Sequence, residues 1–107
     1  MVKLSDFPLQ FRKKTVQERI KRVCRENDVI FLAVFGSFVK GTQTKKSDLD
    51  LLVKFDRSKE KSLLDLIGAE QAMRKVFNRK VDLLTVRGLS PYLRRNILKS
   101  MKVVYER

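Results

Sequence analysis

Two aspartates separated by one residue, Asp48 and Asp50, are the part of this sequence best suited to carry chemistry. They lie in the segment Ser47-Asp48-Leu49-Asp50-Leu51, where polar and apolar residues alternate as in a strand with one face in a core. Both carboxylates are therefore expected on the other face, about 6.5 to 7 Å apart along the backbone. The two charges repel each other. A divalent cation would relieve this repulsion, and Mg²⁺ prefers such hard oxygen ligands.

A second feature, Gly36-Ser37, is expected at the end of the preceding strand. Residues 29–35 form a short apolar run that is β-branched and aromatic and stops at Gly36, which is typical of a buried strand. A Gly-Ser turn at such a strand end can offer backbone N–H groups to phosphate oxygens, particularly where a helical turn begins. Because Mg²⁺ usually keeps water and substrate phosphate among its ligands, the two features predict a site for a metal ion and a phosphate.

A third carboxylate, Asp82, lies in the segment Lys80-Val81-Asp82-Leu83-Leu84-Thr85. This segment predicts another strand, in which Asp82 points away from its apolar neighbours. For each of these candidate site residues, a purely structural role is also open. The aspartates could be the solvated face of a strand, and Gly36 could be only a turn glycine.

Helical spacing and capping residues predict the other elements. A helix is expected from about Leu9 to Asn27, and a second near Ser62-Leu63-Leu64-Asp65, which has capping-box form, as far as Asn78-Arg79. Ser90-Pro91 predicts the start of a third helix, with serine as the N-cap. The predicted order is helix, strand, turn, strand, helix, strand, helix and a last strand over 102–105. The apolar face of the middle helix is expected to consist of Leu63, Leu66, Ile67, Met73, Val76 and Phe77.

The chain has 107 residues, and its 25 Lys plus Arg against 12 Asp plus Glu give a formal net charge of +13. This length fits one small domain over residues 1–107, without a separate acceptor-binding domain. The charge could attract nucleic acid, an anionic nucleotide or an acidic partner protein, or it could be a solvated basic surface. Lys40 could contact a phosphate or be solvated, whereas solvation is favoured for Lys45 and Lys46.

The sequence predicts a cytoplasmic protein without a membrane span. No apolar run approaches the roughly 18 to 20 residues of such a span, and the N-terminus lacks the layout of a secretory signal. Cys24 is the single cysteine and cannot form an internal disulfide, which fits a reducing compartment. It is expected to pack on the apolar face of the first helix. With no histidine in the chain, a zinc site is not expected.

The apolar strand, Gly36-Ser37, ten intervening residues and Asp48-Leu49-Asp50 together resemble the minimal nucleotidyltransferases of the DNA polymerase beta superfamily. The later strand with Asp82 and the stretch Leu89-Ser90-Pro91-Tyr92-Leu93-Arg94 extend the similarity over nearly the whole chain. The resemblance implies an α/β (α+β) nucleotidyltransferase fold, with a mixed sheet of about four strands flanked by helices.

The same resemblance implies the roles of the candidate residues. Asp48 and Asp50 would hold Mg²⁺, Asp82 would complete the catalytic metal site, and Gly36 and Ser37 would take the nucleotide phosphates. Two ions about 3.5 to 4 Å apart can activate an attacking hydroxyl and neutralise a leaving pyrophosphate, with ATP as the substrate. Asp82 could also help to accept the hydroxyl proton.

Two positions depart from many relatives, because Phe38 and Lys40 stand where those proteins carry arginine. A lysine lacks the bidentate fork of arginine, so phosphate recognition by Lys40 could be weaker or differently arranged. Neither departure affects the carboxylates.

Family members this short resemble the antitoxin half of HEPN/MNT toxin–antitoxin pairs, and some of these transfer AMP to a tyrosine hydroxyl on the HEPN ribonuclease toxin. The leading hypothesis is therefore an adenylyltransferase antitoxin with a HEPN-type partner, with which it could form an oligomer. Two alternatives stay open. The chain could neutralise such a partner by complex formation alone, or it could add nucleotides to RNA or a small molecule. Nucleic acid is the less favoured partner, because an acceptor-binding domain is missing.

Overall fold

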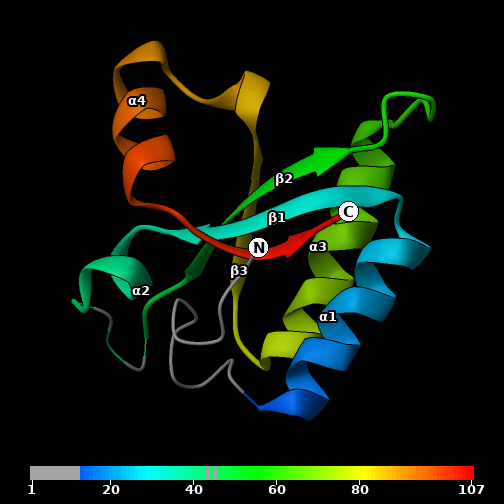
Figure 1. Ribbon diagram of the computed structural model, residues 1–107, viewed down its shortest axis with the longest axis horizontal. Helices are drawn as coiled ribbons and strands as arrows, with labels where there is room; N and C mark the ends of the chain where they lie inside the picture. Colours follow the sequence, from blue (N-terminus) through cyan, green and yellow to red (C-terminus); the bar gives the residue numbers. More distant parts are fainter. Residues whose placement is uncertain (1–12, 43, 45) are drawn as a thin grey trace.

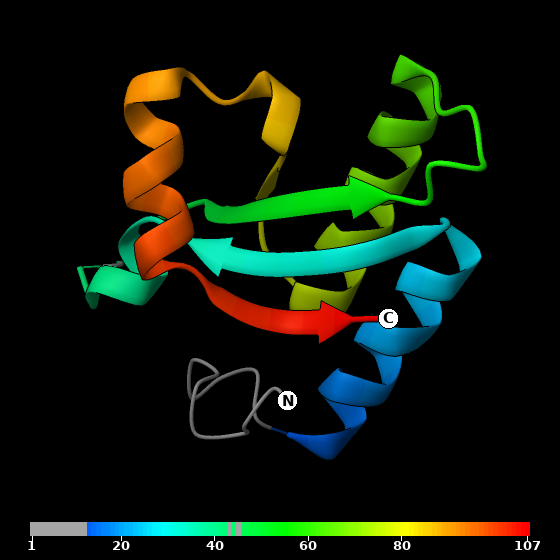
Figure 2. The ribbon, with the colours of Figure 1, turned by 45° about the horizontal axis from the view of Figure 1, so that its top comes forward.

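The structure, a computed structural model, describes residues 13–42, 44 and 46–107. Four strands form one mixed sheet in the order β3-β2-β1-β4. Their bounds are β1 Val29–Phe35, β2 Leu49–Phe55, β3 Val81–Thr85 and β4 Lys102–Glu106. β1 pairs antiparallel with β2 and β4, which lie beside it in Figure 2, whereas β2 pairs in parallel with β3. The predicted mixed sheet of four strands and the predicted order of elements are confirmed.

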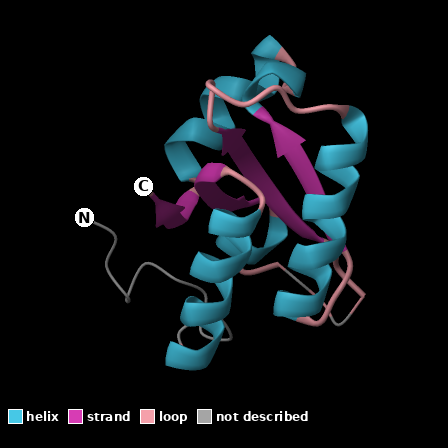
Figure 3. Cartoon of the chain, turned by 90° about the vertical axis from the view of Figure 1, so that its right-hand side faces the viewer, coloured by secondary structure: helices cyan, strands magenta, loops and turns pink. Residues whose placement is uncertain are grey.

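Two helices, α1 (Lys14–Glu26) and α3 (Leu63–Phe77), cover one face of the sheet. Figure 1 shows them side by side, and Figure 3 shows both in front of the strands. Ile20 and Cys24 of α1 and Met73 of α3 are fully buried in the core on this face. The predicted packing of Cys24 is confirmed, and burial raises the pKa of its thiol to about 12. The start of the first helix predicted near Leu9 lies outside the described residues.

The apolar face predicted for α3 is confirmed for Leu66, Met73, Val76 and Phe77, but it is wrong for Leu63 and Ile67. The capping box between Ser62 and Asp65 is present, so the helix begins where its sequence predicts. However, the side chains of Leu63 and Ile67 are 71% and 43% exposed, respectively. The buried residues of α3 begin only at Ala69. Apolar spacing in this helix therefore includes residues that the core does not cover.

The other face of the sheet carries a smaller apolar cluster. Its buried members are Ala33, Phe35, Leu52 and Leu89. Ile97 of α4 (Pro91–Ser100) and Met101, directly after this helix, pack against them. Ser90 caps α4 as predicted by accepting from the N–H of Tyr92, and Pro91 is its first residue. None of the residues of α4 is buried, and Figure 1 shows this helix standing apart from α1 and α3.

Two short elements complete the fold. The helical turn α2 (Ser37–Lys40) follows β1, and the 3₁₀ turn η3 (Val86–Gly88) follows β3. Within the described part of the chain, no helix is long and apolar enough to cross a membrane.

Candidate active site

The register of the sheet brings two of the three candidate carboxylates to neighbouring strands. Asp50 on β2 lies directly beside Asp82 on β3 in the parallel ladder. The N–H of Leu49 donates to the carbonyl of Lys80 at 2.9 Å and so aligns the starts of the two strands. Because Leu49 is fully buried beneath the helices, alternation turns Asp50 to the opposite face of the sheet. Asp48 is exposed and directly precedes β2.

The charges of the three carboxylates act on one another. Burial raises the pKa of Asp50 above its ordinary value, and the negative charges of Asp82 and Asp48 raise it further. A raised pKa means that the folded state binds this proton more tightly than the unfolded state does. Asp50 therefore favours folding below its unfolded-state pKa, and this contribution is lost as the pH rises through its folded-state pKa. At neutral pH the ionised carboxylate thus opposes folding, and a cation at this place would remove that cost.

Gly36 lies against Asp50 from the other side. Phe35 pairs with Asp50 in the antiparallel ladder, so the backbone at Gly36 passes close to the Asp50 carboxylate. A Cβ atom added to Gly36 would collide with Oδ2 of Asp50. The backbone there has φ 77° and ψ −143°, a conformation that side chains rarely allow. This position accordingly needs a glycine for two independent reasons.

The predicted phosphate turn is a single helical turn. Gly36 is the N-cap of α2, and its carbonyl accepts from the N–H groups of Val39 and Lys40 at 3.1 and 3.2 Å. Ser37 is the first residue of α2 and is half-buried. Lys40 is its last residue and is exposed. The turn therefore places Gly36 beside Asp50, with Ser37 next in the chain and Lys40 at the other end of the turn. Lys45 lies outside the described residues.

Arg79 is a residue that the sequence marked only as the end of a helix. Its guanidinium lies 4.6 Å from the ring centroid of Phe38 on α2, and its Nη1 donates to the carbonyl of Ser47 at 3.3 Å. Ser47 directly precedes Asp48, and Arg79 lies two residues before β3, the strand that carries Asp82. Arg79 thus connects the phosphate turn with the starts of β2 and β3. The only signal in the sequence was a basic residue three positions before an aspartate.

The donor set fits a hard divalent cation in its chemistry. Asp48, Asp50 and Asp82 supply only carboxylate oxygens, and all three ion pairs formed by the described residues lie elsewhere. The three carboxylates are neighbours, but their side chains do not converge on a common point. Among the described residues no three acidic, histidine or cysteine side chains are close enough together to hold a metal ion as they stand. An ion would therefore have to draw these side chains toward one another.

Mg²⁺ should stabilise this protein against thermal unfolding. At a concentration about tenfold above its Kd, an ion that binds only the folded state contributes about 1.4 kcal/mol. For a chain of this size, that corresponds to a rise in Tm of roughly 4 to 8 °C. Differential scanning fluorimetry with and without Mg²⁺ measures the shift, and K⁺ at equal ionic strength is the control. An equal rise for wild type and for Asp50→Asn would show that the ion binds somewhere else.

Comparison with known proteins finds relatives along most of the chain. The family model described as "Nucleotidyltransferase domain" matches residues 16–104. The protein adenylyltransferase MntA of Thermococcus cleftensis is 32% identical over 97 residues, which are 91% of this chain and 87% of the relative. A protein of Methanocaldococcus jannaschii, provisionally named a protein adenylyltransferase, is 32% identical over an alignment of 93 residues that covers 78% of this chain and 92% of the relative.

Solved structures share the fold. One described provisionally as a minimal nucleotidyltransferase has a TM-score of 0.68 and 32% identity, and the match covers 82% of this chain and 88% of the other. A crystal structure of a toxin–antitoxin complex with AMP-PNP has a TM-score of 0.68 and covers 85% of this chain and 73% of the other. Its identity is only 22%, so this second likeness concerns the fold alone.

Proposed function

Since this chain belongs to the nucleotidyltransferase domain family, we propose that it transfers AMP from ATP to a tyrosine hydroxyl of a HEPN ribonuclease partner and so acts as an antitoxin. The chain is a nucleotidyltransferase by family. The protein acceptor is supported by relatives named protein adenylyltransferases, which are nearly as short as this chain. The cytoplasm is the expected compartment, and residues 1–107 are proposed as a single minimal nucleotidyltransferase domain.

The observation that carries this proposal is the pairing of Asp50 with Asp82 across the β2–β3 ladder. Two carboxylates on neighbouring strands, with Asp48 close enough for its charge to act on Asp50, form a site of concentrated negative charge in a protein of net charge +13. No Lys or Arg forms an ion pair with any of the three among the described residues. Cations other than the protein's own are therefore the natural partners of this site.

Each candidate residue has a proposed role in the transfer. The acceptor oxygen forms a bond to the α-phosphorus of ATP while the bond to the pyrophosphate oxygen breaks. Mg²⁺, proposed as two ions, would neutralise the phosphates when bound by Asp48, Asp50 and Asp82. Asp82 is exposed and can accept the hydroxyl proton. Gly36 and Ser37 would position the phosphates, with Lys40 as an additional contact, so that positioning and charge stabilisation supply most of the rate.

A second candidate function is neutralisation of the same partner by binding alone. It is favoured by α4, whose Tyr92 and Leu93 are 90% and 55% exposed and offer apolar surface to another protein. Replacing both Asp48 and Asp50 by alanine separates the two functions. An enzyme would lose neutralisation of the partner, whereas a stoichiometric binder would keep it.

The direct test is intact-mass spectrometry of a purified HEPN partner after incubation with this protein, ATP and Mg²⁺. We expect the partner to gain the mass of AMP, and we expect no gain when its acceptor tyrosine is replaced by phenylalanine. The double variant Asp48→Ala and Asp50→Ala is the matched control and should transfer nothing. An unmodified partner, with a wild-type protein that binds ATP and Mg²⁺, would contradict the transferase proposal.

A further inference from the structure

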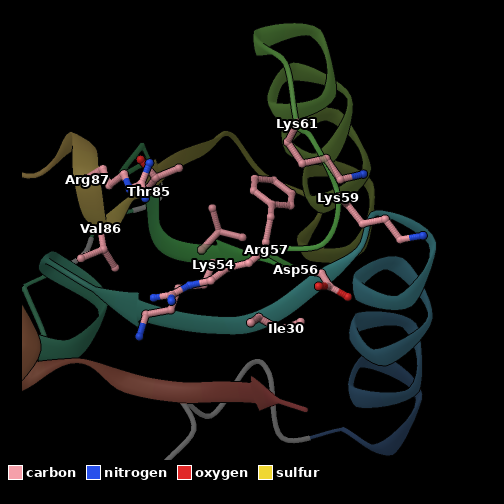
Figure 4. Close-up of a pocket in the computed structure, with 11 residues that line it drawn as sticks. Ile30, Lys54, Asp56, Arg57, Lys59, Lys61, Thr85, Val86 and Arg87 are labelled. Carbon is pink, nitrogen blue, oxygen red and sulfur yellow. The ribbon is translucent and has the colours of Figure 1, made fainter.

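A basic cavity of about 840 Å³ lies at the far end of β2 from the candidate active site. Its lining comes from β2, from the segment 56–61 and from the end of β3 with η3, as Figure 4 shows. This volume is in the range of pockets that bind small molecules or a few side chains. The cavity has five basic lining residues: Lys54, Arg57, Lys59, Lys61 and Arg87.

The cavity has a large excess of positive charge. Its one carboxylate, Asp56, pairs with Arg107 at 3.2 Å, and Lys61 pairs with Asp28 at 2.6 Å. The other four basic residues belong to none of the ion pairs formed by the described residues. Lys54 lies over the ring of Phe31, with Nζ 5.0 Å from the centroid, a contact that does not neutralise its charge. The cavity therefore favours an anionic occupant.

One side of the cavity, at Lys54, shares a sheet face with the candidate carboxylates. Lys54 follows Asp50 by four residues on β2, so alternation places both side chains on the same face, about 13 Å apart along the strand. Leu52 lies between them and is buried under Leu89 and the residues around α4. A molecule that contacts both places must therefore extend over this apolar cluster, which requires a macromolecule or an extended segment.

We propose that this basic cavity binds an acidic segment of the protein acceptor and so positions the acceptor for nucleotide transfer. The inference rests on the protein acceptor proposed above. Ile30, Phe55 and Val86 also line the cavity, so apolar side chains within an acidic segment would find contacts there. A half-open hollow of this size suits a few side chains better than a continuous nucleic-acid backbone. Charge complementarity at such a surface chiefly increases the association rate and the selectivity for the partner.

The test compares two variants that change the net charge equally. Lys54→Glu, Arg57→Glu and Arg87→Glu reverse the cavity, and Lys14→Glu, Lys21→Glu and Arg22→Glu reverse exposed residues on α1, over the opposite face of the sheet. The probe is a fluorescein-labelled copolymer of glutamate and tyrosine, and binding is measured by fluorescence anisotropy without ATP. We expect the cavity variant to bind roughly tenfold more weakly than wild type, and the α1 variant to bind about as wild type does. Thermal unfolding verifies that both variants are folded.

Three results would overturn the docking proposal. The first is that both variants weaken binding equally, and the second is that the wild type does not bind the copolymer. The third is that the wild type and the α1 variant bind an oligouridine instead of the copolymer, whereas the cavity variant does not. With the HEPN partner as acceptor, the cavity variant should raise the KM for the partner and leave the KM for ATP unchanged. The anisotropy measurement involves no chemistry. A failure of AMP transfer would thus contradict the proposed function and leave the docking result standing.

Discussion

Replacing Asp50 by asparagine is expected to abolish nucleotide transfer without destabilising the protein. The change removes the central charge of the three carboxylates and keeps nearly the same shape. We expect the rate of AMP incorporation at saturating ATP and Mg²⁺ to fall by at least about 10³-fold. The Tm without metal should stay the same or rise, because burial and the charges of Asp82 and Asp48 oppose ionisation of Asp50 in the folded state.

Asp65→Asn is the matched control, because it also removes one carboxylate charge. Hydrogen bonds from the backbone N–H and hydroxyl of Ser62 lower the pKa of Asp65, so this carboxylate supports folding above its unfolded-state pKa. That support is lost as the pH falls through its folded-state pKa. Asp65→Asn should therefore lower the Tm and leave transfer nearly unchanged. If Asp50→Asn instead retained transfer, the carboxylate would have no part in the reaction.

Gly36→Ala should have the next largest effect, because it introduces strain and a collision at the same position. The φ of 77° and ψ of −143° cost a non-glycine residue about 1 to 3 kcal/mol. The new Cβ also displaces the Asp50 carboxylate, with which it would overlap. Since a misplacement of about 1 Å can cost about 10²-fold in rate, we expect a loss of kcat of at least that size. Steady-state kinetics and thermal unfolding measure the two effects separately.

Gly41→Ala separates the collision from the strain. Gly41 also has a positive φ, 73°, but apart from Gly41 and its chain neighbours no atom of the described residues lies within 4 Å of the position its Cβ would take. This variant should lose about 1 kcal/mol of stability and keep most of its activity. Equal losses of activity in the two variants would mean that backbone strain alone is responsible, and that the close approach of Gly36 to Asp50 has no catalytic consequence.

Local patterns in the sequence were sufficient to predict most of the helices and strands. β1 has exactly the predicted bounds, and Ser62 and Ser90 cap their helices as their neighbours suggest. Alternation in Asp48-Leu49-Asp50-Leu51 correctly predicted a strand with Asp50 facing away from the buried leucines. These successes share a physical basis, because capping and the alternation of side chains depend on residues only a few positions apart.

The same local reasoning failed where a helix leaves the core. Leu63 and Ile67 continue the apolar spacing of α3 and are nevertheless exposed. The spacing shows which side of a helix is apolar, but it does not show how much of the helix the sheet supports. The contacts of Arg79 with Phe38 and Ser47 were missed for a related reason, since both partners lie more than 30 positions away along the chain.

What the sequence by itself determined is the alternation that turns Asp50 and Asp82 away from their buried neighbours. Only the tertiary structure decided that Asp82 lies beside Asp50, because β2 and β3 are joined through α3 and pair in parallel. It also decided that Gly36 faces Asp50, through the pairing of Phe35 with Asp50 on the other side of β2. Such registers depend on how distant segments pack across a shared core, and no spacing within a single segment contains that information.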